Sequence, residues 1–135
     1  RVAILVNGEP VEYKTERGYA KITREWKEGD IIDYELPMAI HRVKANPKVK
    51  DDLGKVALER GPIVYCVEGN DNLNIDELAV NAKTVFENSY DADLFGGVEV
   101  ITASGGNKID FIAIPYYTWN NRGANKMKVW LPEEN

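Results

Sequence analysis

Turn-forming residues divide this chain into segments that are too short for a long amphipathic helix. Glycine and proline recur along the sequence, often beside asparagine or aspartate, as in Asn7-Gly8 and Gly29-Asp30. Between these turns, apolar and polar residues alternate over short runs, which is the pattern of a half-buried strand. No segment repeats its apolar residues with the period of about 3.6 that an amphipathic helix needs. The sequence therefore predicts an all-β fold with little helix, and the spacing of the strands favours an antiparallel β-sandwich of the jelly-roll type.

The expected strands follow from these alternating runs. Asn-Gly readily adopts the positive φ angles of a type I′ turn, so Asn7-Gly8 is expected to join strands at residues 2–6 and 10–13. The polar, glycine-containing segment 104–107 is expected to join strands at 98–103 and 108–115. Other strands are expected at residues 19–26, 31–36, 38–45, 56–59, 63–68 and 126–131, with a short helical turn at 76–80.

Length and composition are those of one globular domain. The chain has 135 residues, of which 44% are hydrophobic and 29% are charged. A domain of this size buries roughly two thirds of the surface that its unfolded chain exposes. No linker, repeat or low-complexity tract divides the sequence. We therefore expect a single domain over residues 1–135 with one cooperative core.

Net charge and the length of the apolar runs exclude several classes of partner. Lys plus Arg total 17 and Asp plus Glu total 22, so the net charge of -5 would repel a phosphate backbone and we expect no nucleic-acid partner. The longest apolar runs, such as 63–67, are far shorter than the roughly 20 residues that span a bilayer, so no membrane partner is expected.

The chain begins at Arg1 without a leader, which we interpret as a domain boundary. One cysteine forms no internal disulfide, and a soluble location in the cytoplasm, in the periplasm or outside a bacterial cell stays open.

One segment has a pattern that goes beyond a generic strand. Residues 57–72, with the sequence ALERGPIVYCVEGNDN, combine an apolar alternation, a Gly-Pro interruption and a polar end that forms a turn. This segment resembles the one that follows the catalytic barrel in bacterial glycosidases of glycoside hydrolase family 127, the β-L-arabinofuranosidase family. A second block, AIPYYTWNNRG at residues 113–123, is similar to the distal motif of that family. The resemblance continues in the same order at residues 6–9, 18–19, 22–30, 36–38 and 127–131, and it is weakest between residues 74 and 94.

The resemblance implies a place for this chain within a larger enzyme. It implies a non-catalytic β-sandwich accessory domain, a fragment of a bacterial glycoside hydrolase, that packs against a missing α-helical catalytic barrel of the same polypeptide. In the family, the intact enzyme removes L-arabinofuranose units from plant-type glycans, with a cysteine nucleophile that is coordinated to zinc together with other cysteines and a glutamate. These residues belong to the barrel, so zinc is implied there alone. For this chain alone we expect no cofactor, no metal and no enzymatic activity, whereas the parent protein is expected to be a glycoside hydrolase.

The chain's own candidates for catalysis lack specific partners. Cys66 has no second cysteine and lies in an apolar strand, so we expect a buried structural thiol rather than a nucleophile or a metal ligand. His41 has no recognisable partner for a catalytic triad and is also expected to be structural. Many carboxylates could form nominal pairs, but strand ends and turns explain them: Glu59, Glu68, Asp71, Asp91 and Asp93. We therefore assign no catalytic residue in this chain.

Aromatic and polar residues near the end of the chain form a candidate sugar-binding set. Aromatic faces can cover the apolar C–H patches of a sugar, while polar side chains bind its hydroxyl groups. The candidate carbohydrate-binding residues are Tyr116, Tyr117, Trp119, Asn121, Arg122 and Trp130. The alternative is that the aromatic residues are core residues and that Asn-Arg-Gly is an ordinary loop sequence.

Three functions therefore stay open. The first is the accessory domain that stabilises a catalytic barrel, and the alternative is a carbohydrate-binding module whose exposed aromatic residues bind a plant-type glycan. The third is a small hydrolase that uses two convergent carboxylates. Because no strand precedes Val2, an unpaired sheet edge is expected to favour self-association, which makes a homo-oligomer a further candidate.

Overall fold

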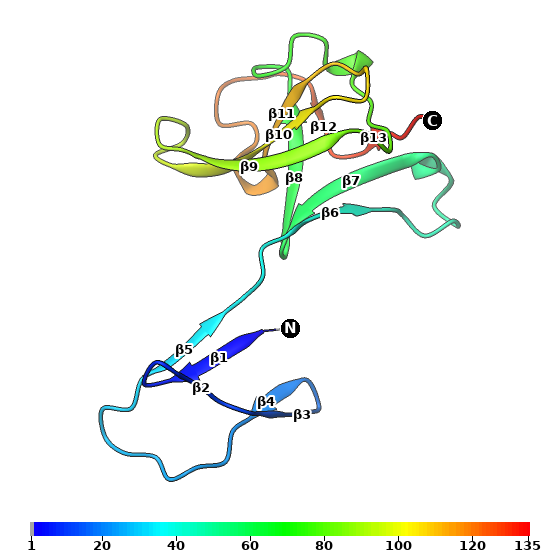
Figure 1. Ribbon diagram of the computed structural model, residues 1–135. Helices are drawn as coiled ribbons and strands as arrows, with labels where there is room; N and C mark the ends of the chain where they lie inside the picture. The colour runs from blue at the N-terminus through cyan, green and yellow to red at the C-terminus, as the bar shows by residue number, and fades with distance from the viewer. Residues whose placement is uncertain (1) are drawn as a thin grey trace. The chain divides into compact units, whose positions relative to one another are not determined.

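The structure is a computed structural model that describes residues 2–135 (Figure 1). Its regular structure consists of antiparallel strands and single turns of 3-10 helix, so the all-β prediction is confirmed. None of the helices within residues 2–135 is long and apolar enough to cross a membrane.

The chain divides into two compact units, whereas the sequence predicted a single domain over residues 1–135. The first unit ends at Pro37 and the second covers Met38–Asn135. Among the described residues of the first unit, Val6 is the one apolar side chain that is buried. The remaining buried apolar side chains lie in the second unit, and this uneven distribution of the core is the physical reason for the division.

The first unit is built around the turn that Asn7 and Gly8 form. Strands β2 (Glu9–Pro10), β1 (Ala3–Val6) and β5 (Ile32–Glu35) pair in that order, and β3 (Lys14–Glu16) pairs with β4 (Tyr19–Lys21). Asn7 and Gly8 have φ angles of 55° and 81°, as the predicted turn between β1 and β2 requires. The Asn7 side chain donates a hydrogen bond to Asp30 Oδ1 at 2.8 Å and accepts one from the Ile31 N–H at 2.9 Å. The strand predicted at 19–26 is shorter than expected, because β4 ends at Lys21.

The second unit contains a curled antiparallel sheet. Its strands are β6 (Ile40–Val43), β7 (Lys55–Arg60), β8 (Ile63–Glu68), β9 (Val85–Asp91), β10 (Val98–Ser104), β11 (Phe111–Pro115), β12 (Met127–Lys128) and β13 (Leu131–Pro132). The 3-10 turns are η1 (Lys50–Asp52), η2 (Ile75–Glu77) and η3 (Tyr116–Thr118). The strand order is β13-β7-β8-β11-β10-β9, with β6 also paired to β7 and β12 to β8. Strand β9 contacts β6, where the guanidinium carbon of Arg42 lies 4.9 Å from the centre of the Phe86 ring, so the sheet curls back toward β6 (Figure 1).

Strand β9 is absent from the predicted strands. It pairs with β10 along its whole length, from Val85 opposite Ser104 to Asp91 opposite Val98. Its residues are mostly polar and exposed, and Phe86 is the member that packs against the core. The local sequence therefore lacks the apolar alternation on which strand prediction depends.

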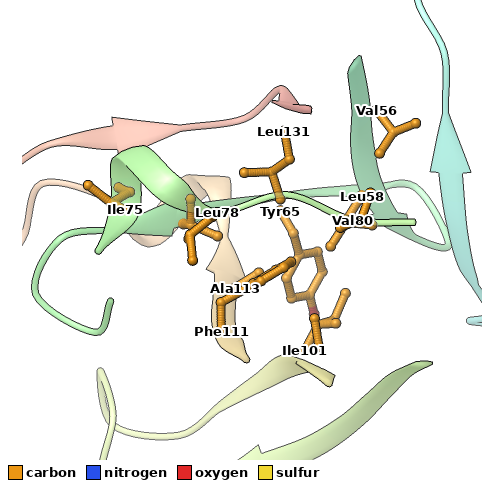
Figure 2. Close-up of a cluster of buried hydrophobic side chains, with 12 residues drawn as sticks. Val56, Leu58, Tyr65, Ile75, Leu78, Val80, Ile101, Phe111, Ala113 and Leu131 are labelled. Carbon is orange, nitrogen blue, oxygen red and sulfur yellow. The ribbon is translucent and has the colours of Figure 1, made fainter. Parts of the chain in front are cut away.

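The two faces of the sheet bury different apolar clusters. On β10, Ile101 and Ala103 belong to one cluster, whereas Val98 and Val100 belong to the other, as the alternation of a strand requires. The first cluster, shown in Figure 2, contains Val56, Leu58, Tyr65, Val67, Ile75, Leu78, Val80, Ile101, Ala103, Phe111, Ala113 and Leu131. The second contains Cys66, Val98, Val100 and Ile114, with Leu94, Phe95, Trp119, Met127 and Val129 packed against it. The central strands are thus covered on both sides.

Candidate functional site

A buried ion-pair network joins the end of β8 to the loop that follows η3. Glu68, the last residue of β8, is fully buried, and the Asp71 side chain is 15% exposed. Arg122 donates from Nη1 to Asp71 Oδ1 at 2.7 Å and from Nη2 to Asp71 Oδ2 at 2.5 Å. Its Nη2 also donates to Glu68 Oε2 at 2.6 Å. A bidentate contact between arginine and a carboxylate is a strong and geometrically specific form of ion pair, and here one cation is shared by two carboxylates.

The second oxygen of Glu68 is also occupied. Its Oε1 accepts hydrogen bonds from the backbone N–H of Asn120 at 2.7 Å and from Asn125 Nδ2 at 3.4 Å. Burial by itself raises the pKa of Glu68, but the hydrogen bonds that its two oxygens accept outweigh burial and hold this pKa below its ordinary value. The hydrogen bonds with Asp71 and Glu68 raise the pKa of Arg122. Glu68 is therefore a stable carboxylate, not the raised-pKa acid that proton donation at neutral pH requires.

Asparagine side chains complete the attachment of the loop. The Gly69 N–H donates a hydrogen bond to Asn125 Oδ1 at 3.0 Å, and Asn70 Nδ2 donates one to the backbone oxygen of Arg122 at 3.3 Å. The buried side chain of Asn72 links the end of β8 to β11 through hydrogen bonds of 2.9 Å. The segments 57–72 and 113–123 are therefore tied to each other by polar contacts.

The network predicts a loss of stability in acid. The pKa of Glu68 is lower in the folded chain than in an unfolded chain, where a glutamate titrates at about 4.3. Between these two pKa values the unfolded state binds more protons, so the free energy of unfolding rises with pH in that window. The stabilisation from Glu68 is then fully present above about pH 4.3 and is lost as the pH falls through the folded pKa. Urea unfolding at a series of pH values should show this loss and a smaller one in Glu68→Gln, whereas an unchanged pH dependence in the variant would contradict the assignment.

Cys66 is confirmed as a buried thiol. It lies in β8 with 2% of its surface exposed, within the second cluster. Burial, reinforced by the charges of Glu68 and Asp71, raises the pKa of Cys66 to about 12. Because the thiolate is the form that attacks electrophiles and binds metals, this environment makes Cys66 inert at neutral pH.

We expect Cys66 to resist alkylation as long as the chain is folded. Iodoacetamide at about pH 8 should label Cys66 much more slowly in buffer than in guanidinium chloride, because unfolding restores a pKa near about 8.5. Mass spectrometry of samples taken over time measures both rates. Equal rates in the two conditions would show that the thiol is accessible.

The structure separates the aromatic members of the predicted carbohydrate-binding set. The rings of Tyr116 and Trp119 lie near each other, with centroids 6.2 Å apart and planes inclined by 38°. Trp119 packs against the second cluster, and Trp130 is also partly buried. Tyr116 and Tyr117 are 43% and 69% exposed. The exposed aromatic surface of this set is therefore formed mainly by the two tyrosines.

The polar members of that set make contacts within the chain. Arg122 is held by the carboxylates of Glu68 and Asp71. Asn121 is exposed, and its Nδ2 donates a hydrogen bond to the backbone oxygen of Thr118 at 2.9 Å. Sugar contact by any of these residues stays a prediction.

The residues present do not fit the cysteine-rich zinc set that the resemblance implies for the catalytic barrel. Within residues 2–135, no three His, Cys, Asp or Glu side chains come together as a metal site would need. His41 is exposed on β6, opposite Glu59 in the strand register. Cys66 is enclosed among apolar side chains on a different strand.

Sequence reasoning missed the ion-pair network. It treated Glu68 and Asp71 as carboxylates of strand ends and turns, and Arg122 as a sugar contact. Residues 68 and 122 are 54 positions apart, so local periodicity carries no information about their pairing. The signal was the resemblance itself, because both partners lie in its two most distinctive blocks.

Comparison with known proteins relates both units to a single family. Residues 40–132 match the model described as the glycoside hydrolase family 127 C-terminal domain. Residues 1–38 match the model described as β-L-arabinofuranosidase, GH127 middle domain. The boundary between these matches, at residues 38–40, lies within two residues of the division of the chain after Pro37.

Individual relatives are similar over almost the whole chain. A non-reducing end β-L-arabinofuranosidase of Bifidobacterium longum subsp. longum is 29% identical over an alignment of 156 positions. The alignment covers 94% of this chain and 23% of that protein. The crystal structure of Ara127N-Se, a GH127 β-L-arabinofuranosidase from Geobacillus stearothermophilus T6, is 39% identical with a TM-score of 0.89, over 99% of this chain and 25% of that one. The structure of the GH127 β-arabinofuranosidase BT3674 is 37% identical with a TM-score of 0.88, over 99% of this chain and 23% of that one. The chain thus spans about a quarter of the length of each of these proteins.

Proposed function

The chain belongs to glycoside hydrolase family 127, and we propose that it serves as a non-catalytic accessory region of a larger glycoside hydrolase. One observation carries this proposal. Glu68, which is buried, and Asp71, which is partly buried, lie in segment 57–72, share Arg122 of segment 113–123 and so fasten a loop. Carboxylates engaged in this way hold the fold, whereas a glycosidase acid pair faces a substrate between its two carboxyl groups.

We propose that the first unit packs against further polypeptide of the parent protein. It matches the middle domain of the family, yet its large apolar side chains are exposed: Tyr19, Trp26, Ile31, Ile32, Tyr34 and Leu36. Apolar surface of this extent is typical of an interface rather than of a free surface. The relatives are about four times as long as this chain, so their length supplies the polypeptide that would cover these residues.

The activity that we propose for the parent follows from the names of the relatives. They are β-L-arabinofuranosidases, so the parent is proposed to release L-arabinofuranose units from plant-type glycans. The proposal assigns this chemistry, with any zinc that it uses, to an α-helical barrel outside this chain.

The decisive experiment compares three polypeptides: this chain, the longer parent polypeptide, and the parent cut before Arg1. We expect the parent to hydrolyse a β-L-arabinofuranoside, this chain to show no turnover, and the cut parent to unfold at a lower temperature because it loses the contacts of this region. Turnover by this chain alone would overturn the proposal. So would a cut parent with the same unfolding temperature as the intact one.

A second candidate function, carbohydrate binding, is favoured by the exposure of Tyr116 and Tyr117. Titration of the chain with arabinan, followed by tryptophan fluorescence, tests it, with Trp119→Ala as the comparison. Saturable binding that this substitution abolishes without unfolding the chain would support the candidate. Binding that the substitution leaves unchanged would move the site elsewhere.

A further inference from the structure

A polar and aromatic group of residues lies at one end of the first apolar cluster, which we name the Arg60 cluster. Its members are Arg60 on β7, Tyr65 on β8, Asn88 and Tyr90 on β9, Glu99 on β10 and Tyr117 in η3. Strand alternation places the members from the sheet on one face. Arg60 lies two residues after Leu58, and Glu99 lies two residues before Ile101, and both of these apolar residues belong to the first cluster.

Hydrogen bonds fix the acceptor side of the Arg60 cluster. The Tyr65 hydroxyl donates to the backbone oxygen of Glu99 at 3.0 Å. Asn88 Nδ2 donates to Glu99 Oε2 at 2.8 Å, and the Glu99 side chain is 34% exposed. The carboxylate is thus held in place while part of it faces solvent.

The donor side of the Arg60 cluster is incompletely satisfied. The Arg60 side chain is 16% exposed, and its Nη2 lies 3.9 Å from Glu99 Oε2, which is too long for a hydrogen bond. Its Nε is buried without a hydrogen-bond partner among residues 2–135. Arg122 Nε is likewise buried without a hydrogen-bond partner among the described residues, but the terminal nitrogens of Arg122 donate three short hydrogen bonds to carboxylates. A guanidinium has five N–H donors, and the hydrogen bond to Tyr65 uses one of them, so Arg60 has capacity for a further acceptor.

Two tyrosine rings lie beside the donor Arg60 and the acceptor Glu99. Tyr90 is the cross-strand partner of Glu99 and is 64% exposed, and Tyr117 is 69% exposed. Burial raises the pKa of the Tyr65 hydroxyl, whereas the charge of Arg60 and its hydrogen bond to Tyr65 lower it. Pro115 pairs with Tyr65 and directly precedes η3, which contacts β8, so Tyr117 lies near the group. Exposed aromatic faces beside polar groups are what a sugar, with its C–H patches and hydroxyls, can use.

Gly97 leaves room for the ring of Tyr90. A Cβ atom at residue 97 would lie 1.9 Å from the Tyr90 hydroxyl oxygen, so only glycine lets this hydroxyl lie against the β9–β10 turn. The backbone there has a φ angle of 112°, which also favours glycine. The missing Cβ atom at residue 97 thus leaves room for the exposed Tyr90 ring beside the turn.

We propose that the Arg60 cluster is a binding site for a neutral saccharide. Arg60 donates hydrogen bonds to sugar oxygens, Glu99 accepts them from sugar hydroxyls, and the rings of Tyr90 and Tyr117 border the sugar. The opposite charges of Arg60 and Glu99 compensate each other, so an uncharged polyhydroxylated ligand fits better than an anion, which would face the Glu99 carboxylate. The site goes beyond the accessory role proposed above and shares only Tyr117 with the aromatic set near the end of the chain.

Titration of the isotope-labelled chain with arabinotriose tests the site, and the amide spectrum reports folding in the same experiment. We expect saturable shifts at the amides of residues 60, 99 and 117 at millimolar sugar. Tyr117→Ala should weaken binding about tenfold or more, because stacking on the ring is lost. Tyr19→Ala is the matched control, since Tyr19 is an exposed tyrosine of the first unit and belongs to neither candidate sugar-binding set, and it should leave the affinity unchanged.

A second variant tests the guanidinium. Arg60→Lys keeps the charge but loses the planar fork of donors, so it should also weaken binding about tenfold. If this variant unfolds, the two tyrosine variants decide the matter. Absence of saturable shifts, equal losses in Tyr19→Ala and Tyr117→Ala, or tighter binding of galacturonic acid than of arabinotriose would each overturn the proposal. The accessory role is tested separately by hydrolysis and by the unfolding temperature of the parent, so one proposal can fail without the other.

Discussion

Replacement of Arg122 by methionine is expected to lower the free energy of unfolding of the second unit by about 3 kcal/mol. The substitution removes the cation that Glu68 and Asp71 share and leaves Glu68, with no exposed surface, as an uncompensated buried charge. Breaking a buried pair in this way typically costs about 3–5 kcal/mol. We place the effect at the low end, because the Arg122 side chain is 25% exposed and water can reach part of the site. Urea unfolding followed by tryptophan fluorescence measures the change.

Two control variants separate this effect from a general loss of surface charge. Arg122→Lys retains the charge but cannot bind Asp71 bidentately, so we expect an intermediate loss. Lys44→Met removes an ion pair to Glu133 in which the lysine side chain is 69% exposed, and exposed pairs contribute about 0–1 kcal/mol. A loss in Arg122→Met no larger than that in Lys44→Met would show that the buried network does not hold the loop.

The strands that the sequence predicts well are those whose core contact is visible in the local pattern. The strand predicted at 63–68 agrees with β8 (Ile63–Glu68), and the one predicted at 98–103 differs from β10 (Val98–Ser104) by one residue. Both contain apolar residues that alternate between the two clusters, such as Tyr65 and Cys66. Here the local sequence and the tertiary environment agree, so the pattern suffices.

Other strands depend on pairing partners that the local sequence pattern does not reveal. The strand predicted at 126–131 divides into β12, which pairs with β8, and β13, which pairs with β7. Strand β9 forms because β10 offers it a full-length partner, although its own residues are mostly polar. Strand propensity reports how a residue fits a half-buried surface, so it cannot reveal which neighbouring strand supplies the hydrogen bonds.

The candidate site shows the same limit more clearly. The sequence identifies Arg122 as a polar residue in a loop, and Arg122 does lie in the loop that follows η3. Its partners, Asp71 and Glu68, lie 51 and 54 positions earlier, and only the fold brings them within hydrogen-bond distance. The sequence can therefore identify candidate charged residues. Only the tertiary structure shows whether such a residue is free to contact a ligand or forms an ion pair within the chain.

Replacement of Ile101 by alanine is expected to cost about 2–5 kcal/mol, because it leaves a cavity inside the first cluster. Ile101 has no exposed surface, and it lies at the middle of β10 between Ala113 on β11 and Asn88 on β9. Figure 2 shows its side chain near the Tyr65 ring. Pairing on both sides limits how far the backbone can move to fill the space, so we expect the upper half of this range.

The control for Ile101→Ala is Ile112→Ala, on the neighbouring strand. Ile112 is 38% exposed, so truncation removes less buried surface and should cost less than about 1 kcal/mol. Equal losses in the two variants would show that the first cluster is not packed as Figure 2 shows it. The same urea unfolding curves give both values.

The double variant of Ile101→Ala and Arg122→Met tests whether the two faces of the sheet act independently. Ile101 belongs to the first cluster, whereas Glu68 alternates with Val67 along β8 and so points to the opposite face. Because the two sites lie on opposite faces of the sheet, their losses should add to within about 0.5 kcal/mol. A combined loss that departs from the sum by more than about 1 kcal/mol would mean that the loop and the first cluster are coupled through β8. In that case the ion-pair network would contribute to the whole sheet, and its role would extend beyond holding the loop.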